Sequence, residues 1–433
     1  MAGSLQPTTL VIFGVSGDLS QRFLLPALSE ICQNSDLRAH LQIVGTSRQA
    51  VSASHVLNGP AATLAAQFEV LQMDYDKPED YQKLKDLTAG HSTNQVIFYF
   101  AVPPQAVLPI IEQLGANKLN GPNYRLLMEK PFGTDLKSAR KLIQEISQHF
   151  KEDQIYRIDH YLAKEMAQNI TVFLGSNALF RNVWNNKFIE RIDITAEESI
   201  GIENRAELWE QTGTLRDFVQ SHLMQLAALV LMEPCPDVFD FSMVQPRRLA
   251  ALKHLEITST SQAVKGQYQG YRQEVNNPES KTETFASVEL KSKSPNWLGV
   301  PVRLTTGKKL KEKLTEIRVY FKKSQAAQTN CLVLRIQPRE AIELELWVKK
   351  PGYDQELEKL ALDFAYKQYY DRLPDAYEQV IVDAVRSRAS LFASSDEVLA
   401  SWEVLQPLLD KWDSHQLKIY KAGSTVEEVI KQV

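Results

Sequence analysis

Residues 8–19 read TTLVIFGVSGDL. The apolar run from Thr8 to Phe13 has the length of a buried strand, and the helical pattern after Leu19 begins directly behind two glycines. Glycines in a strand-to-helix turn allow backbone N–H groups to meet a pyrophosphate at the start of the helix, although a glycine pair also suits a simple tight turn. We expect this turn to contact a dinucleotide through Gly14, Ser16, Gly17, Asp18 and Leu19.

Short apolar runs alternate with helical patterns through the first part of the chain. Such alternation predicts a parallel sheet covered by helices. The expected strands are 8–13, 41–45, 68–71, 96–100 and 124–128. Together with the glycine turn, they indicate an α/β fold with a Rossmann-like dinucleotide-binding domain over residues 1–155.

The pattern changes to a period of two farther along the chain, most clearly at 317–321 and 342–348. That period is typical of strands in an antiparallel sheet with one covered face. Helical patterns cover 217–232 and, as two helices, 376–412. We therefore expect residues 156–433 to form an α+β domain on a large, mainly antiparallel sheet with helices on one face.

The composition excludes several classes of protein. The 433 residues carry a formal net charge of −4, which gives no overall attraction to nucleic acid. No stretch reaches the roughly 18 apolar residues that a membrane span needs, and residues 1–9 lack a signal-peptide pattern. The cysteines Cys32, Cys235 and Cys331 are too widely separated to form a disulfide framework or a CxxC metal site. We expect a soluble, cytoplasmic protein without a metal or a membrane partner.

Three features at predicted strand ends bear on the coenzyme. Arg48 follows the second strand, where an NAD-selective site would place an acidic residue; an arginine there suits a 2′-phosphate, and it also suits a solvated surface. Ala101 and Pro103 belong to a stiff loop behind the strand 96–100, and Lys130 follows the strand 124–128. All of them would lie at the carboxyl edge of the sheet, where ligands bind. We expect NADP as the coenzyme, with NAD as a secondary one.

Two polar clusters follow in the second half. His160 and Lys164 are four residues apart, so on a helix they would share a face and could hold one phosphate. Asp159 would directly precede that helix, a position that also suits an N-cap. His222 lies in a strongly periodic helical pattern, and Asp217, five residues earlier, would lie about 140° around the axis. We therefore expect the partner of His222 to come from another segment.

Four motifs, in this order and spacing, resemble those of the glucose-6-phosphate dehydrogenase family. They are GVSGDL at 14–19, EKPFG at 129–133, RIDHYLAKE at 157–165 and DFVQSHLMQ at 217–225. The resemblance continues through Gly299-Val300-Pro301, Thr306-Gly307-Lys308, the strand 332–338 and Tyr377-Glu378, so it spans nearly the whole chain. The segment 157–165 is highly specific to that family, whereas the first two motifs are shared with other sugar dehydrogenases.

The resemblance implies oxidation of D-glucose 6-phosphate at C1 to 6-phospho-D-glucono-1,5-lactone, with hydride transfer to NADP, at the entry of the pentose phosphate pathway. It also implies a homodimer that requires no metal. His222 would be the general base and Asp159 its partner. Among substrate ligands, His160, Tyr161 and Lys164 would hold the phosphate. The sugar hydroxyls would be bound by Glu198, Asp217, Lys308 and Lys313, and Lys130 would bridge substrate and coenzyme.

Several positions depart from the family pattern. Ala163 replaces a glycine, Ser221 an asparagine and Gln21 a basic residue. The run ELWE at 207–210 stands where a Gly-Tyr-Tyr-Asp or similar run helps to shape the sugar pocket. Two alternatives therefore stay open: a dehydrogenase of another sugar or sugar phosphate, and a catalytically silent NADP or sugar-phosphate sensor. Retention of the proposed base and its partner favours an active enzyme.

Overall fold

The computed structural model describes residues 5–91, 93–203, 205–238, 240–323 and 328–431. Of the N-terminal segment expected to carry no signal peptide, residues 1–4 lie outside these ranges. The chain divides into two compact units, and each is described by itself. The first comprises Met1–Gly133, Lys137–Ala163 and Pro374–Ser395; the second comprises Thr134–Leu136, Lys164–Leu373 and Asp396–Val433. The sequence predicts a single domain boundary, at residue 155. In the structure the chain passes back and forth between the two units several times.

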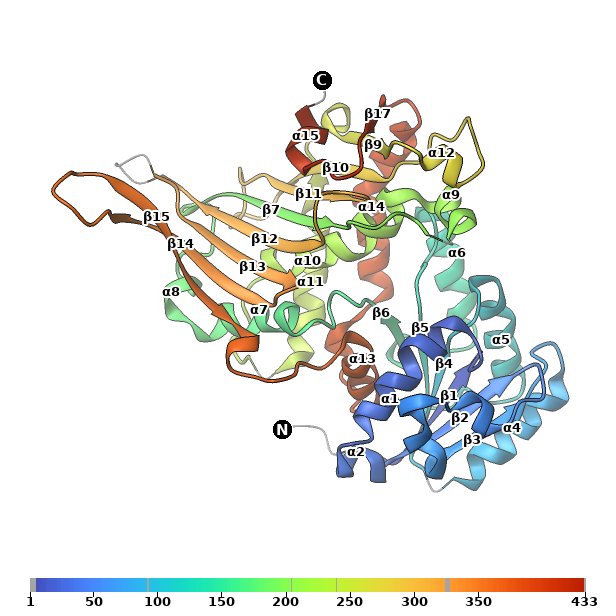
Figure 1. The fold of residues 1–433 in the computed structure, drawn as a ribbon. Coiled ribbons are helices and arrows are strands. Elements are labelled where there is room, and N and C mark those ends of the chain that lie inside the picture. The colour runs from blue at the N-terminus through green and yellow to red at the C-terminus, as the bar shows by residue number, and fades with distance from the viewer. Residues whose placement is uncertain (1–4, 92, 204, 239, 324–327, 432–433) are drawn as a thin grey trace. The chain divides into compact units, whose positions relative to one another are not determined.

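The first unit is built on a seven-stranded sheet with the order β16-β6-β5-β4-β1-β2-β3 (Figure 1). Pairing is parallel from β6 to β3, and β16 joins β6 antiparallel. The predicted parallel, Rossmann-like sheet is confirmed, and its strand order reverses at β1 and β4, where ligands of such sheets bind. The strands are β1 (Thr8–Phe13), β2 (Leu41–Ser47), β3 (Phe68–Gln72), β4 (Gln95–Phe100), β5 (Tyr124–Met128), β6 (Ile155–Ile158) and β16 (Phe392–Ala393).

Helices cover both faces of this sheet, which explains why its strands read as continuous apolar runs. Leu10 and Ile12 of β1 face one hydrophobic cluster, and Val11 and Phe13 face another. The helices of this unit are η1 (Ser20–Leu24), α1 (Leu25–Ile31), α2 (Ser35–Ala39), α3 (Ala53–Val56), η2 (Gly59–Gln67), α4 (Pro78–Gly90), α5 (Pro104–Ala116), α6 (Leu136–Ser147), η3 (Glu152–Gln154), α13 (Ala376–Val385) and η8 (Ala389–Leu391).

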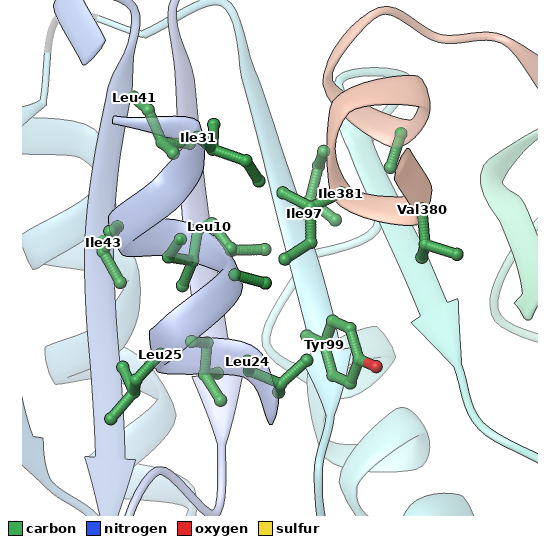
Figure 2. Close-up of a cluster of buried hydrophobic side chains, with 14 of the residues drawn as sticks. Leu10, Leu24, Leu25, Ile31, Leu41, Ile43, Ile97, Tyr99, Val380 and Ile381 are labelled. Carbon is green, nitrogen blue, oxygen red and sulfur yellow. The ribbon is translucent and has the colours of Figure 1, made fainter. Parts of the chain in front are cut away.

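Two helices that are far apart in sequence share the first of these clusters. Figure 2 shows Leu24, where η1 meets α1, beside Tyr99 of β4, and Ile381 of α13 beside Ile97 of the same strand. Each fully buried aliphatic side chain of this kind contributes roughly 1.5–3 kcal/mol. Packing of α13 in this cluster is therefore what returns the segment Pro374–Ser395 to the first unit.

The glycine turn behind β1 has no room for a side chain at its first position. Gly14 adopts a left-handed conformation (φ +85°), and a Cβ there would lie 2.5 Å from the carbonyl oxygen of Ala101. We expect Gly14→Ala to lower the free energy of unfolding by more than about 2 kcal/mol, because strain and a backbone clash add. Gly59→Ala is the matched control, since Gly59 has φ +54° but no atom within 4 Å.

That control isolates the conformational cost, which is roughly 1–2 kcal/mol for a left-handed residue. Urea unfolding of the two variants measures the difference between them. Equal losses of stability would show that the clash with Ala101 is relieved without cost, contrary to this expectation.

The second unit is built on a ten-stranded sheet with the order β15-β14-β13-β12-β7-β11-β10-β9-β17, and β8 pairs with β10 (Figure 1). The β7–β11 and β9–β17 pairs are parallel, and the other pairs are antiparallel, so the predicted mainly antiparallel sheet is confirmed. The strands are β7 (Ile189–Glu197), β8 (Leu255–Ile257), β9 (Val264–Tyr268), β10 (Phe285–Ser292), β11 (Val302–Gly307), β12 (Leu314–Phe321), β13 (Cys331–Gln337), β14 (Ala341–Lys349), β15 (Leu357–Ala365) and β17 (Leu417–Tyr420).

Helices of the second unit pack on this sheet, with η4 against β7, β10 and β11, and α7 against β13. The described helices include none that is long and apolar enough to cross a membrane. They are α7 (Glu165–Ser176), α8 (Ala178–Arg181), α9 (Ala206–Thr214), η4 (Leu215–Leu223), α10 (Met224–Leu231), η5 (Phe241–Met243), α11 (Val244–Lys253), η6 (Thr260–Gln262), α12 (Tyr271–Glu274), η7 (Tyr366–Gln368), α14 (Ser395–Trp412) and α15 (Val426–Lys431).

Candidate active site

The predicted dinucleotide turn lies at the switch point of the seven-stranded sheet. The N–H of Gly17 donates to the carbonyl of Gly14 (3.0 Å), and the hydroxyl of Ser20 donates to the same carbonyl (3.0 Å). A Cβ on Gly17 would lie 3.2 Å from that oxygen and 3.7 Å from the oxygen of Ala101. The turn is therefore a close-packed backbone loop at the start of η1, and side chains at its two glycines would fill it.

The other predicted coenzyme residues of the first unit flank this turn along the chain. Arg48 directly follows β2 and is exposed, while Ala101 follows β4 and Pro103 precedes α5. Gln21, which departs from the family pattern, is bound to the turn, because its side-chain amide donates to the carbonyl of Val15 (3.1 Å). Asp18 is exposed and forms a 3.4 Å ion pair with Arg22, so a cation still stands beside the turn, one position later.

A half-buried glutamate to which the sequence analysis gave no role lies beside His160. Glu129 accepts a hydrogen bond from the hydroxyl of Tyr99 (2.5 Å) and lies 3.2 Å from Nε2 of His160. Burial opposes ionisation of Glu129, but the His160 ring and the Tyr99 hydrogen bond outweigh burial and lower the pKa of the carboxyl group. The ring of Tyr377 lies 4.4 Å from that of His160. Both missed residues belong to the family motifs, Glu129 directly before Lys130 and Tyr377 near the closing helices.

The prediction that His160 and Lys164 share a helix face is wrong. Residues 160–163 form turns, and Lys164 has extended backbone angles (φ −68°, ψ 139°) as the N-cap of α7. The cause is Asp159, whose carboxylate accepts the N–H groups of Tyr161 (2.8 Å) and Leu162 (3.2 Å) and so competes with helical hydrogen bonding. Asp159 is thus buried at the start of a turn that its own side chain stabilises. It lies five residues before Lys164, the N-cap of α7.

Lys164 stands at the N-terminus of α7, a helix of 12 residues. Helix N-termini favour anions, and a carboxylate already lies there: Oε2 of Glu340 accepts the N–H of Met166 (2.6 Å). Burial raises the pKa of Glu340, while the nearby Lys164 acts in the opposite direction. The predicted phosphate ligand Lys164 therefore lies at a helix N-terminus where a carboxyl group already accepts one backbone N–H.

The segment with His222 is a π-helix, η4, and not the α-helix that the sequence predicts. In a π-helix the hydrogen bonds join residues five apart, so Asp217 and His222 lie one turn apart. The expectation that they are separated by about 140° is therefore wrong, because it assumed α-helical geometry. His222 is buried, with its ring edge-on to Phe218 at a centroid distance of 5.4 Å. Ser221, which replaces the asparagine usual in the family, donates its hydroxyl to the carbonyl of Asp217 (2.6 Å). Its side chain is therefore hydrogen-bonded within the same helix.

Two predicted sugar ligands of the second unit are brought together. Glu198 follows β7, Lys308 follows β11, and the buried ammonium of Lys308 donates to Oε2 of Glu198. Parallel pairing of these two strands brings their carboxyl ends together. The adjacent Glu197 has different surroundings, since burial and the carboxylates of Glu312, Glu427 and Glu316 raise its pKa to about 7. Lys313, by contrast, is exposed between β11 and β12.

The run 207–210 lies in α9, just before η4. Glu210 accepts hydrogen bonds from the hydroxyls of Tyr271 (2.7 Å) and Ser280 (2.7 Å) and from the amide of Asn277 (2.8 Å). Burial opposes its ionisation, but these donors outweigh burial and lower its pKa. Trp209 is buried, and the ammonium of Lys308 lies 4.4 Å from the centroid of its ring. Compared with the family's Gly-Tyr-Tyr-Asp run, Trp209 thus keeps an aromatic ring at the third position and Glu210 keeps a carboxylate at the fourth.

The predicted base His222 belongs to the second unit and its predicted partner Asp159 to the first. The predicted substrate ligands are likewise divided between the units. The first unit contains Lys130, His160 and Tyr161, and the second contains Lys164, Glu198, Asp217, Lys308 and Lys313. Within the ranges that the structure describes, no group of three or more His, Cys, Asp or Glu side chains could hold a metal ion.

Comparison with protein families gives two matches that cover nearly the whole chain. Residues 11–169 match "Glucose-6-phosphate dehydrogenase, NAD binding domain", and residues 171–433 match "Glucose-6-phosphate dehydrogenase, C-terminal domain". The glucose-6-phosphate 1-dehydrogenase of Chlamydia pneumoniae is 34% identical, over 97% of this chain and 93% of the relative. That of Borreliella burgdorferi is 35% identical, over 96% and 94%.

Solved structures of this kind share the fold over the full length. A structure described as "Glucose-6-phosphate dehydrogenase in complex with its substrate glucose-6-phosphate" matches with a TM-score of 0.91 and 31% identity, covering 99% of this chain and 98% of the other. Glucose-6-phosphate 1-dehydrogenase from Mycobacterium avium matches with a TM-score of 0.86 and 28% identity, covering 97% and 95%.

Proposed function

Because the chain belongs to the glucose-6-phosphate dehydrogenase family, we propose which of its residues carry out the oxidation of glucose 6-phosphate. The family's activity, as an oxidoreductase of the pentose phosphate pathway, is the function of this chain. The observation that carries it is the match of both family domains together with full-length relatives at about one-third identity.

We propose that His222 is the general base and that Asp159 is its partner. The C1 hydroxyl of the sugar loses its proton to the imidazole, and the C1–H bond breaks with its electron pair as hydride, so that C1 becomes the lactone carbonyl. When bound, the nicotinamide ring accepts that hydride. A buried imidazole at the end of a packed π-helix fits this role because its ring is held by Phe218 and has little freedom to turn. The Asp159 carboxylate would orient the ring and stabilise its protonated form.

The phosphate is proposed to bind to His160, Tyr161 and Lys164. Glu129 supports this assignment for His160, since its carboxylate lies 3.2 Å from Nε2 and fixes the orientation of the ring. Nδ1 is then the remaining donor, and it is a buried atom without a hydrogen-bond partner in the described structure. Lys164 supports it through its place at a helix N-terminus.

The sugar hydroxyls are proposed to bind to Glu198, Asp217, Lys308 and Lys313, with Lys130 bridging substrate and coenzyme. The pair of the buried Lys308 and the half-buried Glu198 supports the assignment because it presents a donor and an acceptor side by side. Hydroxyl groups of a sugar both donate and accept, so such a pair can orient one hydroxyl. The altered run 207–210 keeps a ring against Lys308, which favours the same sugar over a different one.

We propose NADP as the coenzyme, with NAD as a secondary one. The glycine turn fits a dinucleotide, because a Cβ at Gly14 would close it. Arg48 supports the preference for NADP, since an exposed guanidinium behind β2 suits a 2′-phosphate. The cytoplasmic location expected from the sequence stays a prediction.

Replacement of Arg48 by alanine tests this preference. Loss of one charge-assisted contact to the 2′-phosphate is expected to lower kcat/KM for NADP by about 10- to 100-fold. The value for NAD should change by less than about three-fold, because NAD has no group at that position. Arg38→Ala, at an exposed arginine of α2, is the control and should leave both values unchanged. A uniform loss with both coenzymes would remove Arg48 from the 2′-phosphate site.

We propose a homodimer formed through the edge of the ten-stranded sheet. β15 is the edge strand, and its Leu360 and Leu362 are 52% and 66% exposed. They pair across the ladder with Leu346 and Leu344, so a row of apolar side chains reaches the sheet edge. Such rows favour burial against a second chain. Sedimentation equilibrium should give twice the chain mass of 49.1 kDa; a monomer at micromolar concentration would contradict the proposal.

A further inference from the structure

The side chain of Lys308 is enclosed on several sides within the second unit. It is 2% exposed, its ammonium donates to Glu198, and it lies 4.4 Å from the ring centroid of Trp209. The ring centroid of Phe218, on the same helix as His222, is 5.8 Å from the ammonium. Aromatic faces attract cations, and the attraction is strongest for tryptophan and for desolvated charges.

The backbone of Lys308 is fixed independently of these contacts. Its N–H donates to the carbonyl of Thr284 (2.9 Å), and its carbonyl accepts from the hydroxyl of Tyr420 (2.6 Å). What remains free is rotation along the four-carbon side chain. The position of the ammonium is therefore decided by Glu198 and by the two rings.

Trp209 itself has a property that a smaller ring would not have. It is 1% exposed, and its indole Nε1 is buried without a hydrogen-bond partner in the described structure. A buried donor without an acceptor is unfavourable, and phenylalanine at this position would not carry one. We therefore infer that the indole serves through its π face, over which the ammonium of Lys308 lies.

We propose that Trp209 is a positioning residue for Lys308 and thereby determines how the enzyme holds the sugar. The inference rests on the proposed function, in which Lys308 donates to a sugar hydroxyl. An ammonium has three N–H groups; Glu198 takes one, the indole face covers another side, and the remaining direction is left for the substrate. Without the indole, the ammonium rotates among several positions and the sugar hydroxyl meets it in only some of them.

A double-mutant cycle between Trp209 and Lys308 tests the proposal. Trp209→Phe keeps a weaker π face, and Trp209→Leu keeps none. We expect kcat/KM for glucose 6-phosphate to fall by about three-fold and by about ten-fold or more, respectively, with KM for NADP unchanged. In the Lys308→Met background, Trp209→Phe and Trp209→Leu should cause no further loss. Trp297→Phe, at a buried tryptophan that pairs with Trp184, is the matched control and should leave kcat/KM unchanged.

The outcomes separate this proposal from the proposed function. If Trp209→Phe slows the Lys308→Met enzyme by the same factor as the unaltered enzyme, Trp209 acts through general packing and the proposal is overturned. If Lys308→Met alone leaves kcat/KM unchanged, the assignment of Lys308 as a sugar ligand fails, and the proposal fails with it. Thermal unfolding of each variant checks folding, and Trp209→Phe carries the test if the leucine variant unfolds.

Discussion

Replacement of His222 by asparagine is expected to lower kcat by about 10²- to 10⁴-fold, the usual contribution of a positioned general base. Asparagine fits the space and remains polar, but it cannot take a proton from the C1 hydroxyl. KM for glucose 6-phosphate should change by less than about three-fold, because the phosphate ligands are untouched. Absorbance of the reduced coenzyme measures both constants.

His254→Asn is the matched control for this variant. His254 is exposed at the C-terminus of α11, and its Nδ1 is bonded to the carbonyl of Ala250 (2.7 Å). This second histidine of the same unit should tolerate the same change without loss of kcat. A His222→Asn enzyme that kept more than a third of its kcat would show that another group removes the proton.

Removal of the phosphate grip is the second large expected effect. Lys164→Ala should lower kcat/KM for glucose 6-phosphate by about 10- to 100-fold, and the double variant with His160→Asn by about 10³-fold, because each lost contact is charge-assisted. The fold should tolerate Lys164→Ala, since the side chain of this N-cap residue makes no capping hydrogen bond. The measurement is the rate with glucose 6-phosphate compared with the rate with glucose.

Glucose supplies the control within the same experiment. It lacks the phosphate, so the variants and the unaltered enzyme should oxidise it at equal, low rates. Lys253→Ala, at an exposed lysine of α11, should match the unaltered enzyme with both sugars. Equal losses with glucose and glucose 6-phosphate would mean that the variants disturb α7 or the turn at Asp159 and do not report on a phosphate site.

The sequence predicts the strands well for a physical reason. Strands of the first sheet are covered on both faces, so they read as unbroken apolar runs such as the one at β1. In strands β12 and β14 one face is more polar than the other, so apolar and polar side chains alternate along the sequence. The apolar run and the alternation are both local patterns, so they can be recognised in the sequence without knowledge of the fold.

The return of residues 374–395 to the first unit has no such local signal. It depends on contacts between residues far apart, such as the side chain of Gln95, which donates to Thr8 (2.8 Å) and to the carbonyl of Val385 (2.6 Å). The two-residue strand β16 is likewise too short for any periodicity. Sequence patterns predict that α13 exists but not which sheet it covers.

The two local errors at the site have a common cause. A π-helix and an α-helix present similar apolar patterns over nine residues, so the position of Asp217 relative to His222 could not be predicted. An aspartate before a helix and an aspartate that starts a turn also look alike, so Asp159 suggested an early helix start. The other residue roles came from the family motifs, whereas roles for Glu129 and Trp209 came only from their contacts with His160 and Lys308.

This chain oxidises glucose 6-phosphate with a coenzyme, and we propose that it does so through His222 and the ligands of phosphate, sugar and coenzyme named above. The most direct test follows reduced coenzyme while the purified chain is offered glucose 6-phosphate with NADP, the same sugar with NAD, and glucose with NADP. We expect turnover that requires the phosphate and is faster with NADP. No turnover with any aldose 6-phosphate and either coenzyme would contradict it.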